Sequence, residues 1–132
     1  MNRVQGIRWM AVGSMVLATA VMLGAFGAHG LKDVLSEGRM GVYQTAVQYH
    51  FYHGLGLIMV GLVISTLSGV GSIGLRWVPR LLLMGVLLFS GSLYALTLLD
   101  LGWLGIVTPI GGLLFIAGWV LLAQVLWRQS KN

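Results

Sequence analysis

Cysteine is absent from this chain, and charged residues are scarce. The lack of cysteine excludes a disulfide framework and a thiolate metal site. Only 8% of the 132 residues are charged, against roughly 25% in soluble domains. A soluble domain of this length leaves much of its surface in water, so it could not hide a chain that is 58% hydrophobic. These shortages argue against a soluble domain and predict a membrane protein.

Residue patterns that usually carry catalysis are also missing. The chain has no Ser-His-Asp order, no glycine-rich phosphate loop after a strand and no paired carboxylates within an apolar stretch. Its formal net charge is +5, yet no run of basic residues could follow a phosphate backbone. We therefore predict a protein that is not an enzyme and has no nucleic-acid partner.

Four stretches contain no Asp, Glu, Lys or Arg, and each can span a bilayer. About 20 apolar residues cross ~30 Å of hydrocarbon as a helix, and a spanning segment must satisfy its own backbone hydrogen bonds. The sequence therefore predicts one domain over residues 1–132, an all-α integral membrane bundle of four antiparallel helices. The four uncharged stretches are residues 9–31, 40–75, 81–99 and 101–127, and the helices are expected at about 9–28, 45–67, 78–99 and 109–127.

Basic residues are divided unevenly between the two ends of the predicted bundle. One end has only Lys32 and Arg39, together with all three acidic residues. Because basic segments stay in the cytoplasm, we predict a multi-pass protein of the bacterial inner membrane with both termini inside. The six basic residues at the other end are Arg3, Arg8, Arg76, Arg80, Arg128 and Lys131.

The first apolar stretch follows two arginines and has some features of a signal peptide. It is long for the core of a signal peptide, and Ala20, Gly24 and Ala28 recur every four residues along it. Such a row of small residues lets a neighbouring helix approach closely. We expect this stretch to be retained as a true membrane helix.

Residue patterns in the three connections between the helices predict a local structure for each. Residues 31–41 have an apolar face and end near Gly38, which predicts a short helix on the outer interface. Residues 67–75 are rich in Ser and Gly and predict a cytoplasmic loop. Thr108 followed by Pro109 is typical of a helix start, with the threonine as N-cap.

Polar side chains gather at the outer end of the predicted bundle. Such groups are costly at membrane depth and normally face the bundle interior, where they find partners. We expect His29 and His53 to face each other across the first two helices. One interpretation is structural, with hydrogen bonds between helices; the other is a polar layer that binds a ligand. The candidate residues are His29, Lys32, Gln44, Gln48, Tyr49, His53 and Asp100.

More specific chemistry at this layer has weaker support. His50 and His53 are three residues apart, so their rings can approach each other and share a metal ion with His29 or Asp100. Haem ligation would require His29 to pair with one of them across the bundle. A proton- or ion-handling site would use the histidines and Asp100. None of these arrangements matches a known motif, and we predict no cofactor and no metal.

Four motifs give the chain a family resemblance. The chain closely resembles the YgdD- and YwdK-like family of small bacterial inner-membrane proteins, which has a mitochondrial relative. The resemblance implies a four-helix membrane protein with no established activity. His50 stands where this family is expected to carry glutamine, which weakens the metal hypothesis. The motifs are GAFGAHGLK (24–32), YQTAVQYHFYHGLGL (43–57), LFSGSLYALTL (88–98) and TPIGGLLFIAGW (108–119).

The leading hypothesis is a non-enzymatic membrane protein that acts by interaction. It would be an accessory subunit or a binder of lipid or another small ligand, with the polar layer as its recognition surface. Its partners would be membrane lipids, further copies of the chain or another membrane protein. Two alternatives are a small transporter or ion-conducting unit, which would need an oligomer, and a redox accessory protein that binds metal or haem through His29 and His53.

Overall fold

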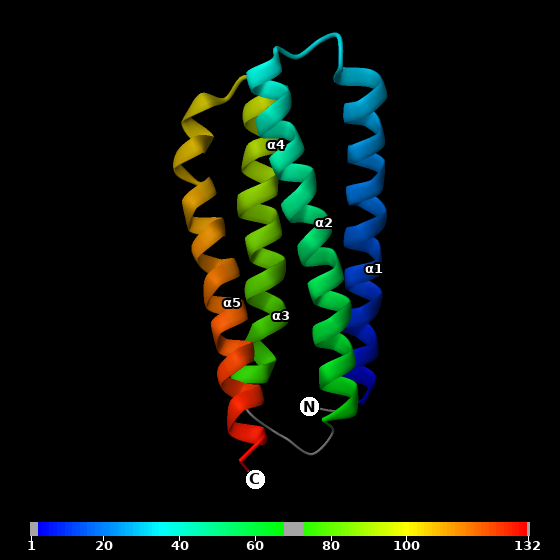
Figure 1. Cartoon of the computed structure of the whole chain (residues 1–132), viewed down its shortest axis with the longest axis vertical. Helices are drawn as coiled ribbons and strands as arrows, with labels where there is room; N and C mark the ends of the chain where they lie inside the picture. The colour runs from blue at the N-terminus through cyan, green and yellow to red at the C-terminus, as the bar shows by residue number, and fades with distance from the viewer. Residues whose placement is uncertain (1–2, 68–72, 132) are drawn as a thin grey trace.

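A computed structural model describes residues 3–67 and 73–131 (Figure 1). Within this part every regular element is helical, and no strand is present. The elements are α1 (Arg3–Phe26), η1 (Gly27–Leu31), α2 (Glu37–Thr66), α3 (Ile73–Gly85), η2 (Val86–Ser90), α4 (Gly91–Leu98), η3 (Gly102–Ile106) and α5 (Thr108–Gln129).

These elements join into four long helical segments, each apolar and long enough to cross a membrane. They run over Arg3–Leu31, Glu37–Thr66, Ile73–Leu99 and Gly102–Gln129. The predicted all-α membrane bundle of four helices is confirmed. Most observed helices begin several residues before the predicted starts, because helical structure continues past the apolar stretch into the flanking polar residues.

The four segments alternate in direction and lie roughly in a row (Figure 1). α1 packs along α2, α2 also packs on α3 and α4, and α5 packs along α3. α1 begins and α5 ends at the same end, which we call the terminal end. The opposite end, called the distal end, carries the 32–36 turn and the connection from α4 to α5.

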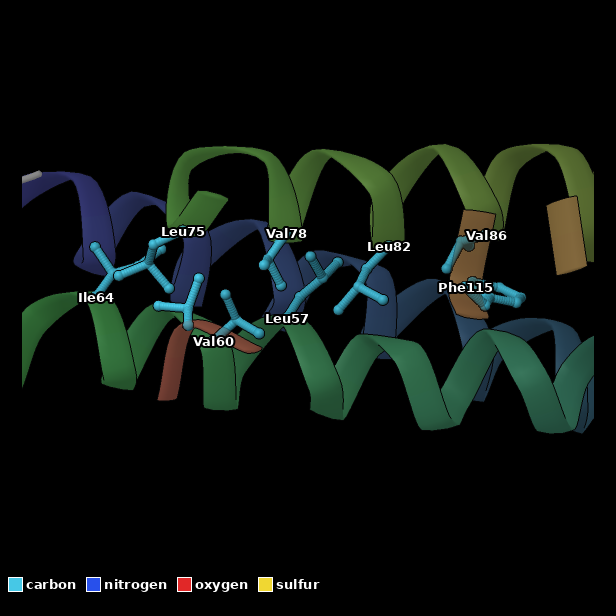
Figure 2. Close-up of a cluster of buried hydrophobic side chains, with 9 residues drawn as sticks. Leu57, Val60, Ile64, Leu75, Val78, Leu82, Val86 and Phe115 are labelled. Carbon is cyan, nitrogen blue, oxygen red and sulfur yellow. The ribbon is translucent and has the colours of Figure 1, made fainter. Parts of the chain in front are cut away.

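The apolar core joins the two inner helical segments and reaches α5. Leu57, Val60 and Ile64 recur at helical spacing on α2 and are fully buried. Figure 2 shows them facing a second row, contributed by the segment that begins with α3. Since lipid tails are as apolar as these side chains, close packing rather than escape from water holds such a core together. The second row is Leu75, Val78, Leu82 and Val86, and α5 adds Phe115 and Val125.

Glycines bring α1 and α2 together along a stripe that differs from the predicted one. The buried small residues of α1 and η1 recur every seven residues, at Gly6, Gly13, Ala20 and Gly27. A Cβ atom on Gly13 would lie 2.8 Å from the backbone nitrogen of Ile58 and 2.9 Å from the carbonyl oxygen of Gly54. Of the predicted Ala20, Gly24 and Ala28 row, only Ala20 is buried. A seven-residue period keeps one face of a helix against a gently crossing partner, which a four-residue period does not.

Two predictions about the distal end are wrong. The expected short helix over residues 31–41 is replaced by a turn, and Gly38 lies in the first turn of α2. The Ser36 side chain accepts a hydrogen bond from the Arg39 backbone N–H, so Ser36 caps α2 and starts it early. Thr108 is the first residue of α5 rather than its N-cap, and its hydroxyl bonds to that of Ser92 at 2.7 Å instead of capping the helix.

The predicted loop over residues 67–75 lies largely outside the described part of the chain. Residues 68–72 are not described, and Ile73 already belongs to α3. At the distal end, Arg39 forms an ion pair with Asp100, which links the start of α2 to the connection before α5. Asp100 has a φ of 58°, a left-handed conformation that aspartate tolerates better than most residues.

Candidate functional site

The polar residues in the first half of α2 point to three different neighbours. Each residue advances about 100° around a helix, so residues that are close in sequence face different sides. Gln44 and Gln48 line a cavity beside α1. His50 bonds to α1 and α4, while His53 bonds to α5. The predicted single layer is therefore divided into separate environments.

A cavity of about 430 Å³ lies between the distal parts of α1 and α2. This volume is in the usual range for small-molecule sites. The five-residue π-helical segment η1 forms part of its wall, and such segments occur often at functional sites. The lining residues are Gly24, Gly27, Ala28, Met40, Gly41, Tyr43, Gln44, Thr45, Val47 and Gln48.

Tyr43 forms one side of this cavity and is held rigidly. Its side chain is 1% exposed, and its hydroxyl donates to the carbonyl oxygen of Leu23 at 2.6 Å. A Cβ atom on Gly27 would lie 2.4 Å from the tyrosine ring. Glycine at position 27 therefore lets the ring lie against α1, which gives the cavity a fixed wall.

The cavity wall is mostly apolar, and its polar groups carry no charge. The Thr45 hydroxyl donates to the carbonyl oxygen of Gly41 at 3.0 Å, and the Gln48 amide donates to the Tyr52 hydroxyl at 2.8 Å. Within the described residues the Gln44 amide makes no hydrogen bond. The glutamine side chains, both exposed, thus leave amide donor and acceptor capacity available to a bound molecule.

These amides lie below the polar surface of the distal end. At 1.5 Å per residue, Gln44 is about 7.5 Å and Gln48 about 13.5 Å along the helix axis from Arg39. If Arg39, paired with Asp100, marks the interface, then Gln48 lies deep in a hydrocarbon layer of ~30 Å. Polar groups at such depth are costly and commonly functional.

His50 joins three helical segments through both ring nitrogens. Its Nε2 lies 3.2 Å from the Thr19 hydroxyl on α1, and its Nδ1 lies 3.1 Å from the Tyr94 hydroxyl on α4. The Thr19 hydroxyl also lies 2.9 Å from the carbonyl oxygen of Val16. Because a carbonyl only accepts, Thr19 donates to Val16 and accepts from His50, and Tyr94 donates to His50.

His53 is held between its own helix and α5. Its Nδ1 lies 2.7 Å from the Tyr49 carbonyl oxygen, so this nitrogen carries the proton. Nε2 then accepts a hydrogen bond of 3.1 Å from the indole N–H of Trp119. The ring also stacks on Phe115, with centroids 3.4 Å apart. Both nitrogens are occupied, which assigns His53 to helix packing.

The sequence matches a known family of proteins over most of its length. The family model described as a protein of unknown function (DUF423) matches residues 23–112. The chain belongs to this family. A UPF0382 membrane protein of Staphylococcus haemolyticus is 50% identical over 114 residues, which cover 86% of this chain and 90% of that protein. YwdK, a UPF0382 membrane protein of Bacillus subtilis, is 43% identical over 115 residues, which cover 86% and 91%. No solved structure matches the chain.

Membership in the DUF423 family confirms the resemblance given above, and the relatives' names agree with a membrane protein. The segment that matches the family model begins just before the cavity wall and contains Gln44, Gln48 and all three histidines. It ends before Trp119, so the α5 partner of His53 lies outside the matched segment.

In this DUF423 protein the predicted pairing of His29 with His53 is wrong. His29 lies in η1 with an exposed side chain, while His53 faces Trp119 and Phe115. His50 and His53 also point to different helices, because three residues correspond to less than one full turn. Within residues 3–67 and 73–131, no group of three or more His, Cys, Asp or Glu is placed to hold a metal ion.

The remaining predicted residues lie away from the cavity. Lys32 is exposed in the turn before α2, and Asp100 pairs with Arg39. The Tyr49 ring packs on Phe89, with centroids 4.6 Å apart. Sequence reasoning placed these three residues with Gln44 and Gln48, because all lie near the distal end; the directions of their side chains separate them.

Several residues of the polar interior were not among the predicted site residues. Tyr94 binds His50, and its ring meets that of Tyr43 edge-on at 5.3 Å. Ser90 is buried in η2 and donates to the carbonyl oxygen of Ala46 at 2.8 Å. The one signal that could have found Ser90 and Tyr94 was their place in a family motif, since spacing alone does not show which helix they face.

Replacing His50 by phenylalanine is expected to lower the free energy of unfolding by about 1–3 kcal/mol, because it leaves the hydroxyl of the half-buried Tyr94 without its partner. Unfolding of the purified protein by SDS, followed by circular dichroism, measures the change. The control is His29→Phe, at a histidine that is exposed. Equal stability of the His50→Phe variant and the wild type would contradict the bridging role.

Proposed function

We propose that this protein is a non-enzymatic binder of a small, uncharged ligand, which it holds in the cavity between α1 and α2. The observation that carries the proposal is the cavity of about 430 Å³ with the Gln44 and Gln48 amides in its wall. Amides both donate and accept hydrogen bonds. The ligand class that fits is therefore a neutral amphipathic molecule with hydroxyl, ester or amide groups.

Three features of the described residues support ligand binding over a purely structural role. The Tyr43 and Thr45 hydroxyls already have partners in the backbone, whereas the Gln44 amide has none. The wall contains no charged side chain, which disfavours an ion. The cavity is also preformed by Gly27 and Tyr43, so binding would not have to order it.

The experiment uses the purified membrane-extracted protein and analyses the small molecules released from it on denaturation. We expect one compound with the wild type, depleted at least about tenfold in Gln44→Leu/Gln48→Leu, since two hydrogen-bonding amides are lost. Gln124→Leu is the matched control, because Gln124 is a glutamine of α5 that lies outside this cavity. Equal recovery from both variants would refute the proposal.

The alternatives remain distinguishable in the same preparations. A flux across proteoliposomes that depends on Gln48 would favour transport. A redox role would need His53 to give up its bonds to Trp119 and Tyr49 before it could bind haem or metal. If Gln44 and Gln48 instead contact a second copy of the chain, the wild type should form a homo-oligomer and the Gln44→Leu/Gln48→Leu variant should not.

We also propose that the protein lies in the bacterial inner membrane with both termini in the cytoplasm. Support comes from the uneven division of basic residues, with six at the terminal end and only Lys32 and Arg39 at the distal end. A reporter that is active only in the periplasm should stay silent when fused to the C-terminus. The same reporter inserted in the 32–36 turn should be active. The reverse pattern would overturn this topology and would place the ligand cavity on the cytoplasmic side.

A further inference from the structure

A second cavity, of about 280 Å³, lies at the terminal end between α1 and α3. Three arginines line it: Arg8 from α1, and Arg76 and Arg80 from α3. The α3 arginines are four residues apart and so share one face of the helix. The other lining residues are Gln5, Trp9 and Val12.

The guanidinium group of Arg80 is positioned by its own helix. Its Nη1 donates to the carbonyl oxygen of Arg76 at 2.5 Å, and its Cζ lies 5.7 Å from the centre of the Trp77 ring. A cation above an aromatic face is attracted by the ring electrons. These two interactions hold one of the three charges in place before any ligand binds.

The chain supplies no Asp or Glu side chain to balance this cluster. All three of its acidic residues, Asp33, Glu37 and Asp100, lie at the distal end. Three like charges around one hollow repel one another, and the cost falls when an anion enters. The planar guanidinium group binds both phosphate and carboxylate oxygens through two parallel hydrogen bonds. A phosphate group suits three arginines better, because it offers them four oxygens where a carboxylate offers two.

A shallow, open apolar groove on the surface of α1 adjoins the basic cavity. Its volume is about 410 Å³, and Val12 lines both hollows. The groove runs toward the middle of α1, where an acyl chain would meet only small and apolar side chains and one threonine. A phosphate site that opens into such a groove matches a phospholipid rather than a free ion. The groove residues are Ala11, Val12, Met15, Val16 and Thr19.

We propose that Arg8, Arg76 and Arg80 bind the phosphate headgroup of one anionic phospholipid, whose acyl chain lies in the groove along α1. The bound lipid would link α1 to α3 at the terminal end, because its phosphate contacts arginines of both helices. It is separate from the cavity of Gln44 and Gln48, and it does not depend on the function proposed for that cavity.

The test adds phosphatidylglycerol to the full-length protein in neutral detergent and measures bound lipid by native mass spectrometry. We expect one tightly bound lipid per chain, and a loss of affinity of about a hundredfold in Arg8→Gln/Arg76→Gln/Arg80→Gln, at about fivefold per arginine. The matched control, Arg3→Gln/Arg128→Gln/Lys131→Gln, removes the same charge from the same end outside the cavity and should change affinity less than about threefold. Equal losses in the two variants would overturn the site in favour of diffuse attraction.

Two measurements on the wild type keep the test independent of folding. Glycerol 3-phosphate, which has the headgroup phosphate without acyl chains, should bind at least about tenfold more weakly than the whole lipid, because it cannot fill the groove. Inorganic phosphate should not displace the lipid. If either compound binds as well as phosphatidylglycerol, the site is one for free phosphate and the lipid assignment is wrong.

Discussion

Replacing Gly13 by leucine should separate α1 from α2 and lower the free energy of unfolding by about 3 kcal/mol. A Cβ atom at position 13 would lie 2.8 Å from the Ile58 backbone nitrogen and 2.9 Å from the Gly54 carbonyl oxygen. Backbone atoms cannot rotate away as the end of a flexible side chain can. The two helices would therefore have to move apart over several turns.

The loss should extend to neighbouring positions of the same stripe. A Cβ atom on Gly61 would lie 2.7 Å from the carbonyl oxygen of Gly6, so α2 meets α1 through glycine from the other side as well. The measurement is SDS-induced unfolding of the purified protein, followed by circular dichroism. The matched control is Gly91→Leu, because a Cβ atom on Gly91 has no neighbour within 4 Å. Similar losses at positions 13 and 91 would contradict close packing of α1 on α2.

Replacing His53 by leucine should cost about 3 kcal/mol of stability, because it removes a buried, stacked ring and leaves the Trp119 indole N–H without its partner. His53 is 6% exposed, stacks on Phe115 and accepts the Trp119 hydrogen bond. This effect concerns packing alone, so ligand recovery from the variant should follow the amount of folded protein.

A double-mutant cycle with Trp119→Phe isolates the hydrogen bond from the rest of the packing. In the His53→Leu background, removing the indole N–H also removes the unpaired donor. The two changes should therefore show a coupling energy of about 1–2 kcal/mol. The His29→Leu variant controls for loss of an exposed histidine. Additive effects of His53→Leu and Trp119→Phe would show that the bond contributes nothing.

The four spans could be predicted from the sequence because one physical rule governs them. Uncharged stretches of sufficient length must form helices in a bilayer, and the four observed segments agree. The helix starts were less predictable, since the flanking residues are helical without being apolar. Ser36 shows why: its side chain caps α2 near residues that were expected to form a separate helix.

The candidate site was predicted only in part, because sequence gives depth more readily than direction. Gln44 and Gln48 were predicted as members of the polar layer, and both line the cavity. His50 and His53 were expected to approach each other, but one faces Tyr94 and the other Trp119. The direction in which each histidine points depends on which helices pack on each side of α2, and a single sequence does not show that arrangement.

The stripe of small residues on α1 is a second case in which the sequence alone does not show which face of a helix packs on its neighbour. Small residues of the first helix recur at several spacings, and the sequence predicts the close contact at the four-residue row of Ala20, Gly24 and Ala28. The buried seven-residue row depends on how α1 crosses α2. That crossing follows from both helices together, since the glycines of α1 lie opposite those of α2.

Native mass spectrometry of the protein, extracted gently from its own membrane, tests the central claim most directly. We predict one small neutral molecule bound per chain, lost in Gln44→Leu/Gln48→Leu and kept in Arg8→Gln/Arg76→Gln/Arg80→Gln, so that it is distinguished from a phospholipid at the terminal end. A bare monomer or a bare homo-oligomer would contradict ligand binding. An added mass equal to that of haem, a metal ion or a second polypeptide would instead identify a different kind of protein.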